Sequence, residues 1–317
     1  MTIIENAIRL TVSEYLGAPP YGALWAVGAL LLFCGVVILI LHAAASSAAP
    51  AAPEPRTLSV RAPGRAGAVR IFTSSELGDR ANQQDHCTYA TAVDEATLQS
   101  AGLLGIVCDG MGGLQGGEAA SQCCAATVLS QYYLLAAQKE PAEALSDCAR
   151  EADTLVASLA SDNGMPLNAG TTLVAAVIRR GAAYWISVGD SRIYLLHGGQ
   201  LRQLTRDHNY ALTLQKLLSL GHVTREEAET HPKREALISY VGQNPISLID
   251  TDSVAFSPEN GDLLILCSDG VTKCLDDRAI EQLALSCPPE QLAKTLTAKA
   301  LQAGTRKHDN TTAMVIH

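Results

Sequence analysis

Charged residues are scarce in this 317-residue sequence: Asp, Glu, Lys and Arg make up 17% of it, against 48% hydrophobic residues. A wholly disordered protein is therefore excluded, because disorder requires the opposite balance. Acidic residues outnumber basic ones by 32 to 23, which gives a formal net charge of −9. Binding a polyanion requires a basic surface, so we expect no nucleic-acid partner. The sequence also lacks G-X-Y and heptad repeats, which excludes collagen-like and coiled-coil proteins.

The nine cysteines include no Cys-x-x-Cys pair, and their number is odd. Several of them lie within apolar runs, such as Cys108 at the end of Ile-Val-Cys and Cys267 at the end of Leu-Ile-Leu-Cys. We interpret them as buried free thiols. Free thiols indicate that most of the chain lies in a reducing compartment.

One long segment, between Glu14 and Glu54, contains no Asp, Glu, Lys or Arg. Within it, the apolar stretch 21–41 would form a helix of about 31 Å, which matches a bilayer core of about 30 Å. The alternatives are a buried core helix or a secretory signal peptide. A signal peptide carries basic residues just before its apolar run, and here the nearest is Arg9. We therefore predict a transmembrane helix at 21–41.

Flanking charge predicts the orientation of this helix. Four arginines follow it between residues 56 and 70, whereas a single arginine precedes it. The positive-inside rule then places the chain after the helix in the cytoplasm. The expected organisation is a short extracytoplasmic segment at 1–20, a transmembrane helix at 21–41, an Ala/Pro-rich linker at 42–65 and one large domain at 66–317.

The hydrophobic pattern of the large domain mixes strands and helices. Short β-rich runs predict strands at 103–108, 173–179, 182–188, 192–196, 262–267 and 311–316. Longer periodic patterns predict helices at 118–138, 141–159, 211–220, 278–285 and 289–302. Strands and helices cluster in pairs instead of alternating, which favours an α+β fold with antiparallel sheets.

Aspartates recur at the ends of these predicted strands. Asp109, Asp190 and Asp269 each follow an apolar run and adjoin a glycine, and Asp309 precedes the last strand. Any single case is explained by a turn, because Asp and Gly are common turn residues. If the carboxylates converge, each pair about 4 Å apart repels by roughly 4 kcal/mol at an effective dielectric constant of about 20, so the cluster requires cations. Oxygen ligands select Mg²⁺ or Mn²⁺ over zinc, and they favour a two-metal hydrolytic centre.

The acidic residues belong to a series of motifs in a fixed order. The motifs lie at 78–85, 109–113, 116–121, 170–173, 188–195, 204–208, 231–242, 267–270 and 309–312. They include Gly-Asp-Arg-Ala-Asn-Gln-Gln-Asp, Asp-Gly-Met-Gly-Gly, Gly-Thr-Thr-Leu, Cys-Ser-Asp-Gly and Asp-Asn-Thr-Thr. This series resembles the metal-dependent protein serine/threonine phosphatases, the phosphatase-2C-like or PPM family, in its bacterial form. The resemblance covers about residues 70–317.

The resemblance implies a four-layer α-β-β-α sandwich with two central antiparallel sheets and a channel for two Mn²⁺ or Mg²⁺ ions at one end. By position, Asp109 would bridge both ions, and the Gly110 carbonyl would bind one of them. Asp269 and Asp309 would hold the second ion. Asp85 would complete the cluster, directly or through a water.

The resemblance also assigns Arg80 to the substrate phosphate, a task that suits a planar guanidinium. It implies an enzyme that hydrolyses phosphoserine and phosphothreonine through a metal-activated water, with Arg80 and Asp109 as the catalytic residues. Its partners would be phosphoproteins, the substrates of a cognate serine/threonine kinase. Together with the predicted helix, this implies a single-pass protein of the cytoplasmic membrane whose domain at 66–317 faces the cytoplasm.

Some positions depart from the family pattern. Gln84 replaces a Glu of many relatives, which removes one negative charge and could lower metal affinity. Met111 stands where some relatives carry a His, and residues 165–168 lack the Asp that several relatives use for a third metal. For Asp190 we expect a structural role in a buried ion pair with Arg192.

Two alternatives remain open at the level of sequence. A catalytically weak relative could serve as a regulatory binding module, and Gln84 is the feature that supports it. A metal hydrolase of small phosphoesters is the other alternative. By the resemblance, residues 209–240 would form a mobile flap beside the site that could bias the choice of substrate. The alternative interpretation is a solvated helical insertion, and the two are compatible.

Overall fold

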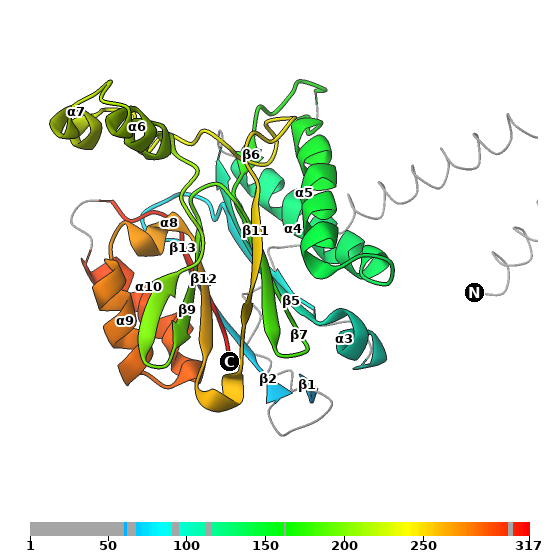
Figure 1. The fold of residues 1–317 in the computed structure, drawn as a ribbon. Coiled ribbons are helices and arrows are strands. Elements are labelled where there is room, and N and C mark those ends of the chain that lie inside the picture. Colours follow the sequence, from blue (N-terminus) through cyan, green and yellow to red (C-terminus); the bar gives the residue numbers. More distant parts are fainter. Residues whose placement is uncertain (1–59, 62–67, 91–94, 112–115, 162, 304–306) are drawn as a thin grey trace, which may run out of the picture. The chain divides into compact units, whose positions relative to one another are not determined.

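Strand pairing is antiparallel throughout the part of the chain that the structure describes. The structure is a computed structural model, and it describes residues 60–61, 68–90, 95–111, 116–161, 163–303 and 307–317 (Figure 1). These residues fall within one compact unit, Glu54–His317. The predicted segments 1–20 and 21–41 lie outside the described residues, as does the predicted linker 42–65 apart from residues 60–61. Among the helices of the described residues, none has both the length and the apolar character needed to cross a membrane.

Two sheets form the centre of the unit. The first has five strands in the order β10-β9-β12-β13-β3. Their bounds are Gln200–Gln203, Arg192–His197, Leu263–Cys267, Thr311–Ile316 and Ile71–Glu76. The second has six strands, in the order β11-β8-β7-β5-β4 with β6 paired to β5. Their bounds are Asp250–Ala255, Ala182–Val188, Leu173–Arg179, Leu103–Met111, Asp85–Tyr89 and Gly170–Thr171. A separate short pair joins β1 (Val60–Arg61) to β2 (Ala68–Val69).

Helices cover the outer face of each sheet (Figure 1). Helices α4 (Gly116–Leu135) and α5 (Pro141–Ala157) pack on the six-stranded sheet. Helices α9 (Asp277–Ser286) and α10 (Pro289–Ala303) pack on the five-stranded sheet. The shorter helices are α3 (Glu95–Ala101), α6 (Tyr210–Ser219), α7 (Arg225–Thr230), α8 (Asp269–Thr272) and the 3₁₀ turn η1 (Pro258–Asn260).

Side chains that alternate along a strand enter two different cores. On β12, Leu264 and Leu266 lie in the core between the two sheets, whereas Ile265 and Cys267 lie in the core under α9 and α10. Successive strand residues point to opposite faces of a sheet, and both faces are covered here. This explains why β12 is apolar at every position, and it produces the layer order helix, sheet, sheet, helix.

The predicted α+β fold with antiparallel sheets is confirmed. Strands β7, β8 and β13 have the predicted bounds, and the five predicted helices are present with ends shifted by a few residues. The prediction did not include β3, β4 and β11. These strands carry polar residues at buried or edge positions, as in Asp-Thr-Asp-Ser-Val-Ala of β11, so they lack the apolar runs on which the prediction relied.

Eight cysteines lie among the described residues, and all are free thiols. Cys108, Cys124, Cys148 and Cys267 are buried, as the apolar runs around them predicted, and the others are partly buried. Burial raises the pKa of the Cys108 thiol well above its usual value, with a further contribution from neighbouring Cys124. These thiols therefore act as small apolar core residues.

Candidate active site

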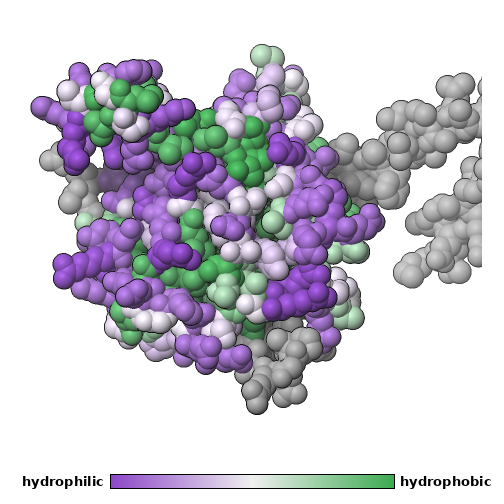
Figure 2. Space-filling model, in the orientation of Figure 1, coloured by the Kyte–Doolittle hydropathy of each residue, from purple (hydrophilic) through white to green (hydrophobic). Residues whose placement is uncertain are grey.

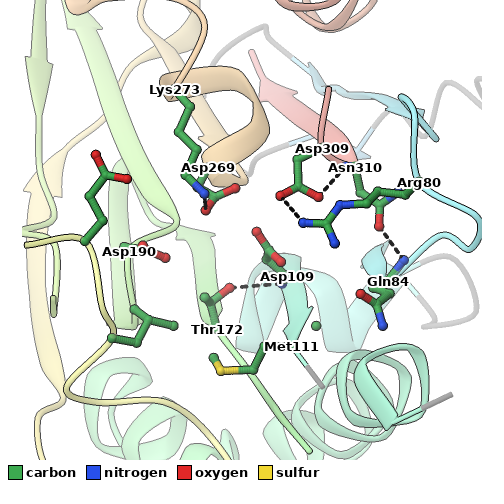
Figure 3. A pocket seen from close by; sticks show the side chains of 13 residues that line it. Arg80, Gln84, Asp109, Met111, Thr172, Asp190, Asp269, Lys273, Asp309 and Asn310 are labelled. Carbon is green, nitrogen blue, oxygen red and sulfur yellow. Dashed lines mark hydrogen bonds and ion pairs between the residues drawn. The ribbon is translucent and has the colours of Figure 1, made fainter. Parts of the chain in front are cut away.

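A pocket of about 280 Å³ lies at the end of the sandwich where β5, β8 and β12 finish and β13 begins. Figure 3 shows the carboxylates of Asp109, Asp269 and Asp309 turned toward the same space. The residues that line the pocket are Arg80, Gln84, Asp109, Gly110, Met111, Thr172, Asp190, Glu235, Leu237, Asp269, Lys273, Asp309 and Asn310. Acids from segments far apart in the sequence thus meet at one place, as the strand-end pattern predicted.

Asp85 and Asp109 lie directly opposite each other on the antiparallel strands β4 and β5. Asp85 is only 5% exposed, and Asp109 is partly buried at the pocket wall. Like charges in directly opposite positions destabilise a strand pair. Burial raises the pKa of Asp109 well above its usual value, and the charges of Asp85 and Asp269 raise it further.

Asp85 is buried next to the pocket residue Asp109 and is held by a serine. Ser268 Oγ donates to Asp85 Oδ2 at 2.7 Å and itself accepts from the backbone N–H of Thr312 at 3.0 Å. Burial raises the pKa of Asp85 to about 7, although the hydrogen bond from Ser268 opposes the shift. The other oxygen, Oδ1, is buried without a hydrogen-bond partner. A buried carboxylate oxygen without a partner is costly unless a proton or a cation reaches it.

The backbone of Asp109 is fixed by the Gly-Thr-Thr motif. Its N–H donates to Thr172 Oγ1 at 2.9 Å, and its carbonyl accepts from Thr171 Oγ1 at 2.9 Å and from the Thr172 N–H at 2.8 Å. Thr172 Oγ1 also forms a 2.7 Å hydrogen bond with Ser191 Oγ inside the protein. The motif therefore sets the position of Asp109 without occupying its carboxylate.

The residue after Asp109 has no room for a side chain. A Cβ on Gly110 would lie 2.0 Å from the Gly117 carbonyl oxygen, at the start of α4. The Gly110 N–H donates to the Gln84 carbonyl at 3.0 Å. Two glycines in close contact therefore bring α4 against β5 and keep the backbone of Gly110 at the pocket wall.

Asp309 and Arg80 form an ion pair at the rim of the pocket. Arg80 Nη2 lies 2.7 Å from Asp309 Oδ2, and the Arg80 side chain is 55% exposed. The hydrogen bond to Asp309 raises the pKa of Arg80 above its usual value. Asp309 Oδ1 accepts from the backbone N–H of Asn310 at 2.8 Å, and Asn310 Oδ1 accepts from the backbone N–H of Gln84 at 2.8 Å. The motifs at 78–85 and 309–312 are thus joined at the pocket.

Asp269 occupies the first turn of α8 and pairs with Lys273 one turn later. The salt bridge involves Asp269 Oδ2, while Oδ1 is buried and has no hydrogen-bond partner. Lys273 also lines the pocket, and in Figure 3 its ammonium lies at the Asp269 carboxylate. The strand-end pattern did not identify Lys273, although a Lys four residues after an Asp at the start of a helix is a recognisable signal for an ion pair.

The expected ion pair between Asp190 and Arg192 is wrong. Arg192 instead binds Asp207 with two hydrogen bonds, from Nε at 2.9 Å and from Nη2 at 2.7 Å. The chain turns at Gly189, whose φ of +104° favours glycine, and Asp190 then lines the pocket. Burial raises the pKa of Asp190 to about 7, Asp269 raises it further, and Lys273 lowers it.

The segment 209–240 contributes Glu235 and Leu237 to the pocket wall. It carries α6 and α7, which project at the upper left of Figure 1, above α8, and form a protrusion in Figure 2 with both hydrophilic and hydrophobic surface. The prediction that this segment lies beside the site is therefore confirmed. Glu235 and Leu237 were not predicted, because neither belongs to a motif.

The donor set of the pocket fits a hard divalent cation. Its potential ligands are carboxylate and backbone oxygens, and Asp85 Oδ1 and Asp269 Oδ1 are buried without partners. Among the described residues, however, no three Asp, Glu, His or Cys side chains lie close enough together to hold one ion. Arg80 and Lys273 each engage one oxygen of a carboxylate in the pocket, of Asp309 and of Asp269. Waters, which Mg²⁺ usually retains, would complete such a site.

Comparison with known proteins agrees with this geometry. The family model of protein phosphatase 2C matches residues 74–306. This chain belongs to the protein phosphatase 2C family. One relative of this phosphatase is the serine/threonine phosphatase stp of Listeria monocytogenes serotype 4b (strain F2365). The two are 36% identical over 200 residues, which are 62% of this chain and 74% of the relative.

Solved structures share the fold. The serine/threonine phosphatase of S. agalactiae matches with a TM-score of 0.65 and 25% identity, covering 78% of this chain and 99% of that one. The catalytic domain of the serine/threonine protein phosphatase PstP, in complex with two manganese ions, matches with a TM-score of 0.59 and 28% identity. That match covers 78% of this chain and 97% of the PstP chain. The chain is therefore a serine/threonine protein phosphatase of a metal-dependent family.

Proposed function

We propose that the pocket hydrolyses phosphoserine and phosphothreonine in proteins with two Mn²⁺ or Mg²⁺ ions held by its acids. The observation that carries this proposal is the opposed pair Asp85 and Asp109. Asp85 Oδ1 is buried without a hydrogen-bond partner, and burial raises the pKa of both carboxyl groups. Clustered carboxylates repel one another, and cations offset that repulsion. The two manganese ions of the PstP domain support the same class of metal here.

Five residues would hold the ions. Asp109 would contact both, because it lies at the centre of the pocket wall, and the Gly110 carbonyl would contact one. Asp269 and Asp309 would contribute their carboxylates from the side of the pocket that faces Asp109. Asp85, the strand neighbour of Asp109, would contribute beside it. When bound, divalent ions neutralise the charge of a phosphate group and lower the pKa of water.

Arg80 would bind the phosphate group. Its guanidinium lies at the pocket rim and is half-exposed, so it can exchange Asp309 for phosphate oxygens without leaving the pocket. A planar guanidinium donates two parallel hydrogen bonds to a phosphate, which fixes its orientation for attack in line with the leaving oxygen.

Water, and not a side chain, would attack the phosphorus. Thr172 supplies the single hydroxyl among the described residues that line the pocket. That hydroxyl is engaged by the Asp109 N–H and by Ser191. The proposal therefore has no covalent intermediate on a hydroxyl of the pocket. Because Gln84 stands where many relatives carry a Glu, the pocket has one carboxylate fewer than theirs. The affinity for metal would be lower, but all five proposed ligands are present.

The test uses the full-length protein, Mn²⁺ and a phosphothreonine peptide. Turnover should disappear with EDTA, and Asp269→Asn should lower kcat/KM by about 100-fold or more. Asp252→Asn is the matched control, because Asp252 is exposed on the edge strand β11 and away from the pocket lining. Turnover that is unchanged both by EDTA and by Asp269→Asn would contradict the proposal.

The same assay separates the alternatives. A regulatory binding module would bind the phosphopeptide and Mn²⁺ without releasing phosphate. A hydrolase of small phosphoesters would prefer nucleotides or other small esters to the phosphopeptide. The segment 209–240 favours a protein substrate, because it adds a chain of about 30 residues beside the pocket that a peptide can contact.

We further propose that residues 21–41 anchor this phosphatase in the cytoplasmic membrane, with the domain in the cytoplasm, where it would oppose a serine/threonine kinase. The charge-free stretch and the four arginines after it support this arrangement. Alkaline carbonate extraction of membranes should leave the full-length chain in the pellet. Release of the chain into the supernatant would contradict an integral anchor.

A further inference from the structure

Among the described residues that line the pocket, two side chains are basic, and each is paired with one aspartate. Arg80 pairs with Asp309, and Lys273 pairs with Asp269. Figure 3 places these two pairs on opposite sides of Asp109. Arg80 already has a role at the phosphate in the proposed function. Lys273 has no role there, although it lies as close to the acids.

The position of Lys273 is set by α8. Asp269 begins this short helix, and Lys273 follows four residues later, so both side chains lie on the same side of it. The ammonium contacts Asp269 Oδ2, and the side chain of Asp269 is only 16% exposed. Asp269 Oδ1 remains buried and without a hydrogen-bond partner. One oxygen of this carboxylate thus faces a cation of the chain itself, and the other is left for a second cation.

The charge of Lys273 reaches more than one acid. Burial opposes its protonation, but Asp269, together with Asp190 and Asp309, outweighs that effect and raises the pKa of Lys273 above its usual value. In return, Lys273 lowers the pKa of Asp190, which burial and Asp269 raise. A lysine ammonium is charged at neutral pH, and in contact with Asp269 it offsets part of the repulsion among the acids of the pocket.

We propose that Lys273 is a tethered cation of the acidic pocket, which stabilises the acids in the absence of metal and weakens the binding of divalent ions at Asp269. An ion that binds Asp269 Oδ1 would lie within a few ångströms of the ammonium on Oδ2, and like charges at that distance repel. Lys273 is thus a positioning residue that sets the metal affinity. This inference rests on the proposed metal centre.

The test is titration of full-length, metal-free protein with Mn²⁺ in a calorimeter. Lys273→Met removes the charge but keeps the length of the side chain, and it should lower the Kd for Mn²⁺ by about tenfold. Lys273→Arg keeps the charge and should bind Mn²⁺ as the wild type does. Lys294→Met is the matched control, because Lys294 is exposed on α10 and does not line the pocket.

Thermal unfolding in EDTA gives a second readout that does not depend on activity. Without metal, Lys273→Met should unfold about 2–4 °C below the wild type, because the acids lose their counter-charge. Added Mn²⁺ should raise the midpoint of the variant more than that of the wild type. A variant that does not fold even with Mn²⁺ would show that Lys273 is mainly structural and would overturn the inference.

The Kd for Mn²⁺ of Lys273→Met, compared with that of the wild type, distinguishes the remaining outcomes. A Kd unchanged or raised in Lys273→Met overturns the inference and leaves the proposed phosphatase centre intact. A raised KM for phosphopeptide with an unchanged Kd for Mn²⁺ would assign Lys273 to the substrate and would likewise overturn it. If neither the wild type nor the variant binds Mn²⁺, the metal centre itself is refuted, and this inference falls with it.

Discussion

Asp85 on β4 and Asp109 on β5 face each other directly across an antiparallel strand pair, one of them buried and the other at the wall of the pocket. A sheet selected for stability alone would not place two carboxylates in this position. Such a local conflict is typical of a functional site, where the arrangement serves binding at the expense of stability. The first prediction follows from this conflict.

Asp85→Asn should move stability and activity in opposite directions. The amide can still accept the hydrogen bond from Ser268, so the fold is retained, while removal of the charge lowers the pKa of Asp109. We expect the metal-free protein to gain about 1 kcal/mol in free energy of unfolding at pH 8. We also expect a loss of about 100-fold in kcat/KM with Mn²⁺. Urea unfolding in EDTA and the phosphopeptide assay measure the two effects. A variant that loses stability and activity together would contradict this prediction.

The stability of the metal-free protein should depend on pH through Asp85 and Asp190. Both have a pKa of about 7 in the folded protein, above the ordinary value near 4 of an unfolded chain. The folded state therefore holds more protons than the unfolded state between about pH 4 and pH 7, and the stability that these groups contribute is lost as the pH rises through that window.

A variant isolates this effect from the other titrations of the protein. Relative to the wild type, Asp190→Asn should gain stability as the pH rises from 5 to 8, by on the order of 2 kcal/mol, because the folded wild type loses its proton in this window. Both proteins are unfolded in urea with EDTA at each pH. A constant difference between them across the range would show that Asp190 does not titrate near neutral pH.

Thr172→Val should reduce both stability and turnover. The variant leaves the N–H of Asp109 without its acceptor and breaks the hydrogen bond to Ser191. We expect a loss of about 1–3 kcal/mol in stability and at least tenfold in kcat. Thr127→Val is the control, because Thr127 Oγ1 donates to the Cys123 carbonyl within α4 and Thr127 does not line the pocket. That variant should keep its activity, and a loss of activity equal to that of Thr172→Val would argue against a specific role for Thr172.

The sequence predicted best the elements whose residues are covered on both faces. Strands β7 and β13 are apolar along nearly their whole length because a helical layer lies on one side and the second sheet on the other. Strand β4 was not predicted, since its sequence, Asp-His-Cys-Thr-Tyr, shows no apolar run and its place depends on pairing with β5. Tertiary pairing of this kind leaves no local pattern to read.

Within the site, the motifs predicted which acids meet but not how they are paired. Arg192 lies two residues from Asp190, and this closeness in sequence favoured an ion pair between them. In the structure, the turn at Gly189 directs Asp190 to the pocket, and Asp207, which follows the hairpin of β9 and β10, reaches Arg192 instead. The ion-pair partner of Arg192 thus depends on the direction that the backbone takes at a turn and a hairpin. The spacing of residues along the chain does not predict that direction.

Gly110→Ala should lower activity strongly through packing alone, without any change of charge. The added Cβ would lie 2.0 Å from the Gly117 carbonyl oxygen, and that atom belongs to backbone, so β5 and the start of α4 must separate. We expect a loss of at least 100-fold in kcat/KM, because Asp109 lies one residue away and a shift of about 1 Å is enough for such a loss. Stability should fall by about 1–3 kcal/mol.

Gly181→Ala is the matched control for this substitution. Gly181 has a φ of +78° in the turn after β7, and a Cβ there would meet nothing within 4 Å. Its replacement should cost about 1 kcal/mol of backbone strain and leave kcat/KM unchanged. If Gly110→Ala behaved like Gly181→Ala, the close contact between β5 and α4 would not be what positions Asp109, and the hydrogen bonds from Thr171 and Thr172 would have to hold it alone.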